Sequence, residues 1–200
     1  IIIISLLRNM HNNNEKKIVD YLLLLTVSVF FLTGCIQDDD EEPNGANIQV
    51  NDELPTFSVR LNTGETITSQ SLEGKISFIV LMSVTCPDCI AELPVIERLY
   101  TEYKKDKDIV IFTISREQGE QIVGKFWEEQ HYTMPYSAQE DRTVYSLFAK
   151  SGVPRIYISN KNRIVQYIYT DDPLAKYEEL KANIESLIKA SNKLPEKHKL

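Results

Sequence analysis

The chain alternates between apolar stretches of strand length and segments in which apolar side chains recur at helical spacing. Residues 76–84 and 109–114 are almost wholly apolar, which is typical of strands covered on both faces of a sheet. Helical spacing of apolar residues follows each of these strands and returns at the end of the chain. It predicts helices over 87–105, 117–130, 141–148 and 172–188.

Shorter stretches of alternating polarity predict two antiparallel hairpins. One covers residues 57–68 with a turn at Asn62-Thr63-Gly64, and the other covers 155–169 with a turn at Asn160-Lys161-Asn162. A strand–helix–strand unit that is followed by a hairpin and a final helix is typical of an α/β sandwich. The sequence therefore predicts one α/β domain.

The segment before this domain has the pattern of a secretory signal. Lys16 and Lys17 precede the uncharged run 21–32, and small residues follow before Cys35. Such a run spans about 18 Å as a helix, which is less than the roughly 30 Å of a bilayer core. A cleaved signal that starts at Met10 is therefore favoured over an uncleaved membrane anchor.

Leu32-Thr33-Gly34-Cys35 resembles the lipobox of bacterial lipoproteins. The resemblance implies cleavage before Cys35 and acylation of that cysteine, which would attach the protein to a membrane. The acidic run 38–42 resembles a surface-export signal, and a solvated spacer is the alternative. We expect a signal peptide over 1–34, a lipidated tether over 35–47, a folded domain over 48–191 and a polar tail over 192–200. The expected location is the cell envelope, at the outer membrane of a Gram-negative bacterium, facing either the periplasm or the outside.

Composition narrows the class of function. Hydrophobic residues make up 42% and charged residues 26% of the chain, as in ordinary globular proteins. The net charge of -7 offers no basic surface to a phosphate backbone, so we expect no binding of nucleic acid.

The candidate chemistry lies in Cys86-Pro87-Asp88-Cys89, directly after the first buried strand and at the start of a helix. A helix N-terminus favours a thiolate, so Cys86 is expected to be the exposed nucleophile. Cys89, one turn further on, would then resolve the mixed disulfide. A zinc half-site is disfavoured because the other ligands are missing. A purely structural disulfide remains an alternative for an exported protein.

Together these features resemble the membrane-anchored thioredoxin-like proteins of the TlpA/ResA type, within the redoxin superfamily. The similarity covers about residues 50–190. It rests on five short motifs: Leu54-Pro55-Thr56-Phe57, Leu72-Glu73-Gly74-Lys75, Cys86-Pro87-Asp88-Cys89, Glu92-Leu93-Pro94 and Gly152-Val153-Pro154. The resemblance implies a thioredoxin-like fold with a central mixed β-sheet flanked by helices and an N-terminal β-hairpin.

The resemblance also implies roles for residues outside the cysteine motif. Pro154 is expected to be cis and to lie against the cysteines, where the backbone of Val153 pairs with a substrate strand. Thr85, beside Cys86, is a further candidate for substrate contact. Glu92 is the candidate acid that moves the proton of Cys89, and a solvated surface glutamate is the alternative. Arg155 is expected either to bind an acidic substrate segment or to be an exposed residue at the start of a strand.

These observations predict a membrane-anchored, extracytoplasmic thiol-disulfide oxidoreductase. Asp88 opposes a thiolate at Cys86 by like-charge repulsion, which favours a reductase of protein disulfides. No cofactor and no metal are expected, because the two sulfurs carry the electrons. The expected partners are protein thiols or disulfides and a membrane electron donor or acceptor. Two alternatives remain: a thiol peroxidase of the same superfamily, and a non-catalytic surface lipoprotein with a structural disulfide.

Overall fold

A five-stranded mixed sheet forms the centre of the domain in the computed structural model, which describes residues 45–193. The central strand β3 (Ile76–Met82) pairs in parallel with β4 (Ile109–Ser115) and antiparallel with β6 (Arg155–Ser159). The short β5 (Tyr136–Ser137) extends the sheet beyond β4, and β7 (Val165–Tyr169) extends it beyond β6. All seven residues of β3 are buried, as expected for a strand covered on both faces.

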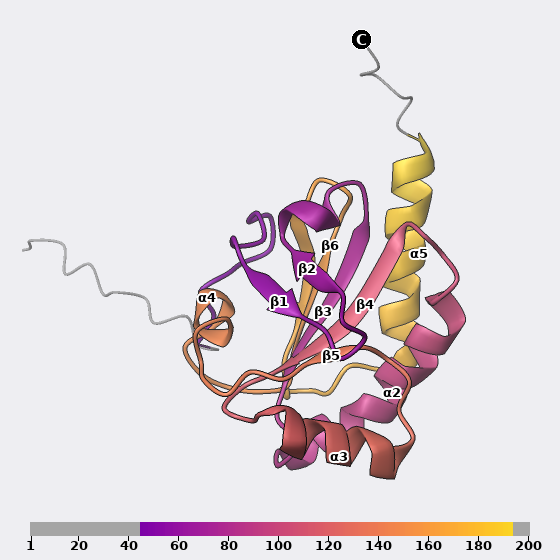
Figure 1. Cartoon of the computed structure of the whole chain (residues 1–200). Helices are drawn as coiled ribbons and strands as arrows, with labels where there is room; N and C mark the ends of the chain where they lie inside the picture. The colour runs from indigo at the N-terminus through magenta and orange to yellow at the C-terminus, as the bar shows by residue number, and fades with distance from the viewer. Residues whose placement is uncertain (1–44, 194–200) are drawn as a thin grey trace, which may run out of the picture. The chain divides into compact units, whose positions relative to one another are not determined.

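Helices cover one face of the sheet, and a hairpin with a short helix covers the other (Figure 1). The first group comprises α2 (Pro87–Tyr103), α3 (Glu120–Gln130) and α5 (Tyr177–Lys193). The second comprises β1 (Ser58–Arg60), β2 (Thr66–Thr68), the 3-10 helix η1 (Gln70–Leu72) and α4 (Tyr145–Phe148). This mixed sheet between helices has the architecture that the sequence predicted.

The second face is closed by an aromatic cluster. The ring of Phe148 in α4 lies 5.6 Å from that of Phe57 and 5.1 Å from that of Tyr157, and all three side chains are buried. The hydroxyl of Tyr157 donates to the carbonyl of Phe148 at 3.1 Å, so its polar end is satisfied inside the core. Burial of this cluster fixes α4 against β6.

Several predicted boundaries were wrong, including the end of the first long helix, which is at Tyr103 rather than 105. The first strand ends at Met82 rather than 84, because a turn begins there in which the amide of Cys86 donates to the carbonyl of Ser83. Helix α3 starts at Glu120 rather than 117, with Gly119 as its N-cap. Helix α5 starts at Tyr177 rather than 172, and the amide of Ala175 in the loop before it donates to the side chain of Glu92.

Two other elements also differ from the prediction. The helix expected over 141–148 is confined to α4, since the side chain of Asp141 accepts from the amide of Thr143 and holds residues 141–143 in a turn. Strand β5 was not predicted, because two residues are too few to show an alternating pattern.

The proposed signal peptide, Cys35 and the polar tail beyond 193 lie outside the described residues. Between 45 and 193, none of the helices has both the length and the apolar composition needed to cross a bilayer.

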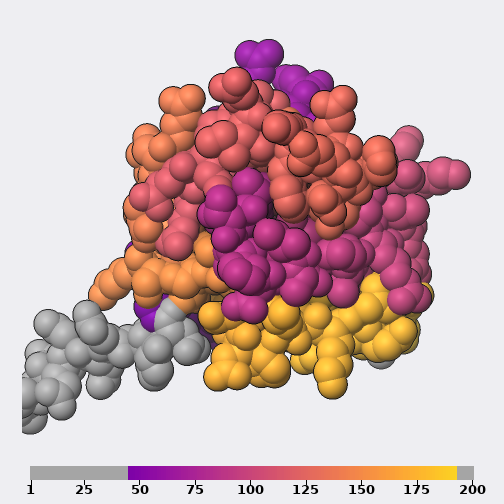
Figure 2. All heavy atoms as spheres, turned by 90° about the horizontal axis from the view of Figure 1, so that it is seen from below, coloured from indigo at the N-terminus to yellow at the C-terminus, as the bar shows by residue number. Residues whose placement is uncertain are grey.

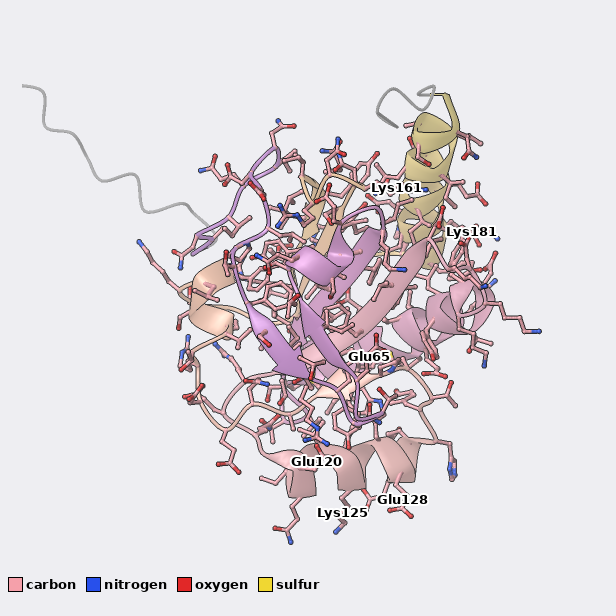
Figure 3. All side chains as sticks on the ribbon, turned by 45° about the horizontal axis from the view of Figure 1, so that its top comes forward. Glu65, Glu120, Lys125, Glu128, Lys161 and Lys181 are labelled. Atoms are coloured by element: carbon pink, nitrogen blue, oxygen red, sulfur yellow. The ribbon has the colours of Figure 1, made fainter. Side chains whose placement is uncertain are left out.

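Several of the surface ion pairs lie at the end of the sheet away from Cys86. Lys161, in the β6–β7 turn, pairs with Asp108 at 2.5 Å, and Lys181 of α5 pairs with Glu102 of α2 at 2.5 Å. Figure 3 shows Lys161 and Lys181 on either side of α5, while Lys125 and Glu128 lie on α3 at the lower end of the view. Such exposed pairs contribute little to stability.

Candidate active site

The two cysteines form the first turn of α2. Cys86 is the N-cap residue, and its sulfur accepts a hydrogen bond from the amide of Cys89 at 3.4 Å. Pro87 occupies the first helical position, where the absence of an N–H costs nothing. Cys86 is half-buried, Cys89 is only 1% exposed, and both are free thiols. The sulfur of Cys86 therefore lies at the positive end of a helix and within reach of a partner.

The loop before β6 lies directly against Cys86. The thiol of Cys86 donates to the carbonyl of Val153 at 3.3 Å, and the Val153–Pro154 peptide bond is cis. The predicted cis geometry and its position beside the cysteines are confirmed.

Tyr145 of α4 holds the same loop from the other side. Its hydroxyl donates to the carbonyl of Gly152 at 2.7 Å, and Gly152 adopts a φ of +80°, which favours glycine. The guanidinium groups of Arg116 and Arg142 each lie 4.7 Å from the centre of the Tyr145 ring. The position of the cis-proline loop thus depends on a buried tyrosine that sequence reasoning missed.

Glu92 is buried and lies one helical turn beyond Cys89. Only 2% of the residue is exposed, so the alternative of a solvated surface glutamate is wrong. Its Oε1 accepts from the amide of Ala175 at 3.0 Å, and its Oε2 is buried without a partner among the described residues. Burial raises the pKa of this carboxyl to about 7, against the weaker opposite effect of the Ala175 amide.

Burial also determines the protonation state of Cys89. It raises the pKa of the Cys89 thiol well above its ordinary value, and the nearby Cys86 and Glu92 act in the same direction. Cys89 is therefore a thiol at neutral pH and needs a base before it can attack a disulfide.

Gln118 is a residue of this site that sequence reasoning missed. Its side-chain oxygen accepts from the amide of Val84 at 2.8 Å, and its amide nitrogen donates to the hydroxyl of Thr85 at 3.3 Å. The available signal was topological, because the carboxyl ends of the parallel strands β3 and β4 share one edge of the sheet. Thr85 itself is exposed beside Cys86, where a substrate can reach it.

Arg155 starts strand β6 but is buried. Only 2% of the residue is exposed, so the alternative of an exposed arginine at this position is wrong. It follows Pro154 directly, but its Nε donates to the carbonyl of Ser151 at 3.0 Å.

The surface at this end of the domain is built from several distant segments (Figure 2). Residues near 80–95 lie in the middle of the view, with α3 and the loops around it above them and the C-terminal segment below. Among residues 45–193 no group of three or more metal-ligating side chains occurs.

Comparison with known proteins identifies the family. Residues 50–168 match the sequence profile of the AhpC/TSA family. The chain belongs to the AhpC/TSA family. It is 29% identical over 164 residues to the thiol-disulfide oxidoreductase ResA of Oceanobacillus iheyensis, which covers 78% of this chain and 82% of that relative. The thioredoxin-like protein YneN of Bacillus subtilis is 24% identical over 139 residues, or 69% of this chain and 81% of that protein.

Solved structures share the fold. A solution structure from Bacteroides thetaiotaomicron superposes with a TM-score of 0.67 at 21% identity, over 73% of this chain and 94% of that one. The exposed lipoprotein thioredoxin Etrx1 of Streptococcus pneumoniae superposes with a TM-score of 0.57 at 16% identity, over 66% of this chain and all of that one. The predictions of a thioredoxin-like fold and of an oxidoreductase related to ResA are confirmed.

Proposed function

We propose that this member of the AhpC/TSA family reduces disulfide bonds in extracytoplasmic proteins with Cys86 and Cys89. The observation that carries the proposal is the position of the Cys86 sulfur, which is the N-cap of α2 and 3.3 Å from the carbonyl of Val153. A strand that pairs with the backbone at Val153 would bring its disulfide to this sulfur.

The exchange proceeds in two steps. The Cys86 thiolate attacks one sulfur of the substrate disulfide, which forms a mixed disulfide and releases the other substrate sulfur as a thiolate that takes up a proton. Cys89 then loses its proton and attacks the Cys86 sulfur. This closes the Cys86–Cys89 disulfide and releases the second substrate thiol. The substrate gains two electrons, the cysteine pair loses two, and a membrane dithiol partner returns them.

Glu92 is proposed as the group that accepts the Cys89 proton. A buried carboxyl with a pKa of about 7 is divided between its two protonation states at neutral pH, as a proton acceptor must be. Its unpartnered Oε2 leaves one oxygen free for that proton.

We further propose that lipidation of Cys35 anchors the domain at the outer membrane, with the acidic run 38–42 as a tether. The Leu32–Cys35 motif supports this, and the solved Etrx1 protein carries the description of an exposed lipoprotein. Globomycin, which blocks lipoprotein signal cleavage, should cause the full-length precursor to accumulate, and Cys35→Ser should release the domain from membrane fractions.

The direct test is the redox equilibrium of the Cys35→Ser chain, whose only remaining cysteines are Cys86 and Cys89. The protein is equilibrated in graded dithiothreitol buffers, alkylated and weighed intact. A reversible two-electron transition near the roughly -270 mV of thioredoxin supports a reductase. A transition near the roughly -120 mV of DsbA reverses the direction. A bridge that stays closed below about -300 mV overturns the catalytic role.

A second assay separates the thiol peroxidase alternative. Cys89→Ser retains the nucleophile but cannot resolve a mixed disulfide, so it should trap substrate proteins on Cys86. Consumption of hydrogen peroxide that survives in this variant at the wild-type rate would favour the peroxidase instead.

A further inference from the structure

Arg155 is a buried cation for which the described residues supply no counterion. Its Nη1 has no hydrogen-bond partner among residues 45–193, and none of the ion pairs in that range includes it. Its Nε donates to the carbonyl of Ser151 at 3.0 Å. An arginine stays charged inside a protein, so it cannot remove the cost of burial by losing a proton.

The neighbours of Arg155 on β6 and on the loop before it are neutral. Tyr157 projects to the same face of β6, two residues away, and its hydroxyl donates to the carbonyl of Phe148. Burial raises the pKa of the Tyr157 phenol, against the weaker opposite effect of Arg155, so it carries no negative charge at neutral pH. Gly152 approaches so closely that a Cβ there would lie 3.5 Å from Nη2 of Arg155.

A cavity of about 480 Å³ opens beside Arg155. Part of its wall is apolar, from Ile48, Val50, Ile168 and Pro173. Asp172 and Glu179 also line it, and both are exposed to solvent. The volume falls in the range of small-molecule sites, which combine an apolar wall with a few polar groups.

We propose that this cavity binds a monocarboxylate with an apolar body, and that Arg155 supplies the counter-charge. The planar guanidinium matches a carboxylate in shape, and its Nη1 is unused. A dianion such as phosphate is disfavoured, because Asp172 and Glu179 would repel the second charge. The apolar wall would hold the aliphatic part of the ligand.

Four probes test the chemistry on the purified full chain. N-acetylleucine represents the free C-terminus of a peptide, and N-acetylleucinamide has the same body without the carboxylate. Hexanoate represents a free aliphatic acid, and inorganic phosphate represents a dianion. A ligand at about 100 times its dissociation constant should raise the melting temperature by roughly 5–10 °C. We expect this for N-acetylleucine or hexanoate, and the stronger of the two identifies the source of the carboxylate.

Two arginine variants provide the matched pair. Arg155→Met should raise the melting temperature without ligand, because a buried unpaired charge is removed, and should abolish the response to carboxylates. Arg163→Met is the control, since Arg163 lies in the β6–β7 turn and pairs with Glu53 at 2.5 Å and Glu73 at 2.8 Å. It should lower the melting temperature and keep the full carboxylate response.

Several results would overturn the site. They are an equal response to N-acetylleucinamide, a stronger response to phosphate, an unchanged response in Arg155→Met, or no response at all in the wild type. If Arg155→Met fails to fold, Arg155→Gln takes its place. Amide chemical shifts of Ile168 and Thr170, which line the cavity, follow binding in the wild type without any variant.

Discussion

One acidic and one basic side chain are buried in the described part of the chain. They are Glu92 of α2 and Arg155 of β6. Each is 2% exposed, each makes one hydrogen bond with the backbone, and each leaves one polar atom without a described partner. They differ in what burial does to them. A carboxyl can bind a proton and become neutral, whereas a guanidinium keeps its charge.

This difference underlies the two roles proposed above. Burial brings the pKa of Glu92 to about 7, which fits its proposed role as acceptor of the Cys89 proton. Burial of Arg155 leaves a fixed positive charge, which a bound anion would neutralise. A buried polar atom without a described partner therefore supports the proposed proton transfer at Glu92 and the proposed ligand binding at Arg155.

The largest expected effect is on the rate of exchange in Glu92→Gln. An amide cannot accept the Cys89 proton, so disulfide reduction at pH 7 should fall about 10²-fold or more. Formation of the mixed disulfide at Cys86, measured by stopped-flow, should change little, while its resolution should slow and lose its pH dependence near 7.

A second glutamate of the same helix serves as control. Glu97 accepts hydrogen bonds from the amides of Thr133 and Met134 at 3.0 Å and 2.9 Å, on the loop before β5. Glu97→Gln should lower stability without altering the pH dependence of resolution. Equal kinetic losses in both variants would reduce Glu92 to a structural residue.

The next effect is on stability against pH. The folded pKa of Glu92 is raised from 4.5 to about 7, so the folded state binds the proton more tightly than the unfolded state. Its contribution to the free energy of unfolding falls as pH rises from about 4.5 to 7, by roughly 3 kcal/mol in total. Urea unfolding at pH 5 and pH 8 should show this loss in the wild type and a smaller one in Glu92→Gln. A loss of equal size in the variant would assign it to other groups.

The effect of Arg155→Met on stability, in contrast, should not depend on pH. Removing a buried unpaired cation can raise the free energy of unfolding by about 1–4 kcal/mol. Since arginine does not titrate, the gain should be the same at pH 5 and pH 8. A gain present at only one of these pH values would mean that a titrating group, such as Asp172, pairs with Arg155.

The sequence predicted most of the elements because their signals are local. The apolar run of β3 and the spacing of Cys86 and Cys89 need no tertiary information. The burial of Glu92 and Arg155 does. Glu92 is covered by the loop that contains Ala175, and the same glutamate on an isolated helix would be solvated. Gln118 and Tyr145 reach the site from loops and helices far along the chain, so only the assembled sheet brings them to Cys86 and Pro154.

Asp88 offers the smallest expected effect, because it is an exposed acid between Cys86 and Cys89, whereas Glu92 is buried one turn further on. Its charge opposes the Cys86 thiolate through solvent, where salt screens it. Asp88→Asn should increase the rate of Cys86 alkylation at pH 7 about twofold at low salt, and the gain should shrink at high salt. It should also lower the stability of the Cys86–Cys89 disulfide relative to the dithiol, but only slightly. A gain that is large and independent of salt would mean that Asp88 acts by direct contact, and that exposure does not separate the roles of the two acids.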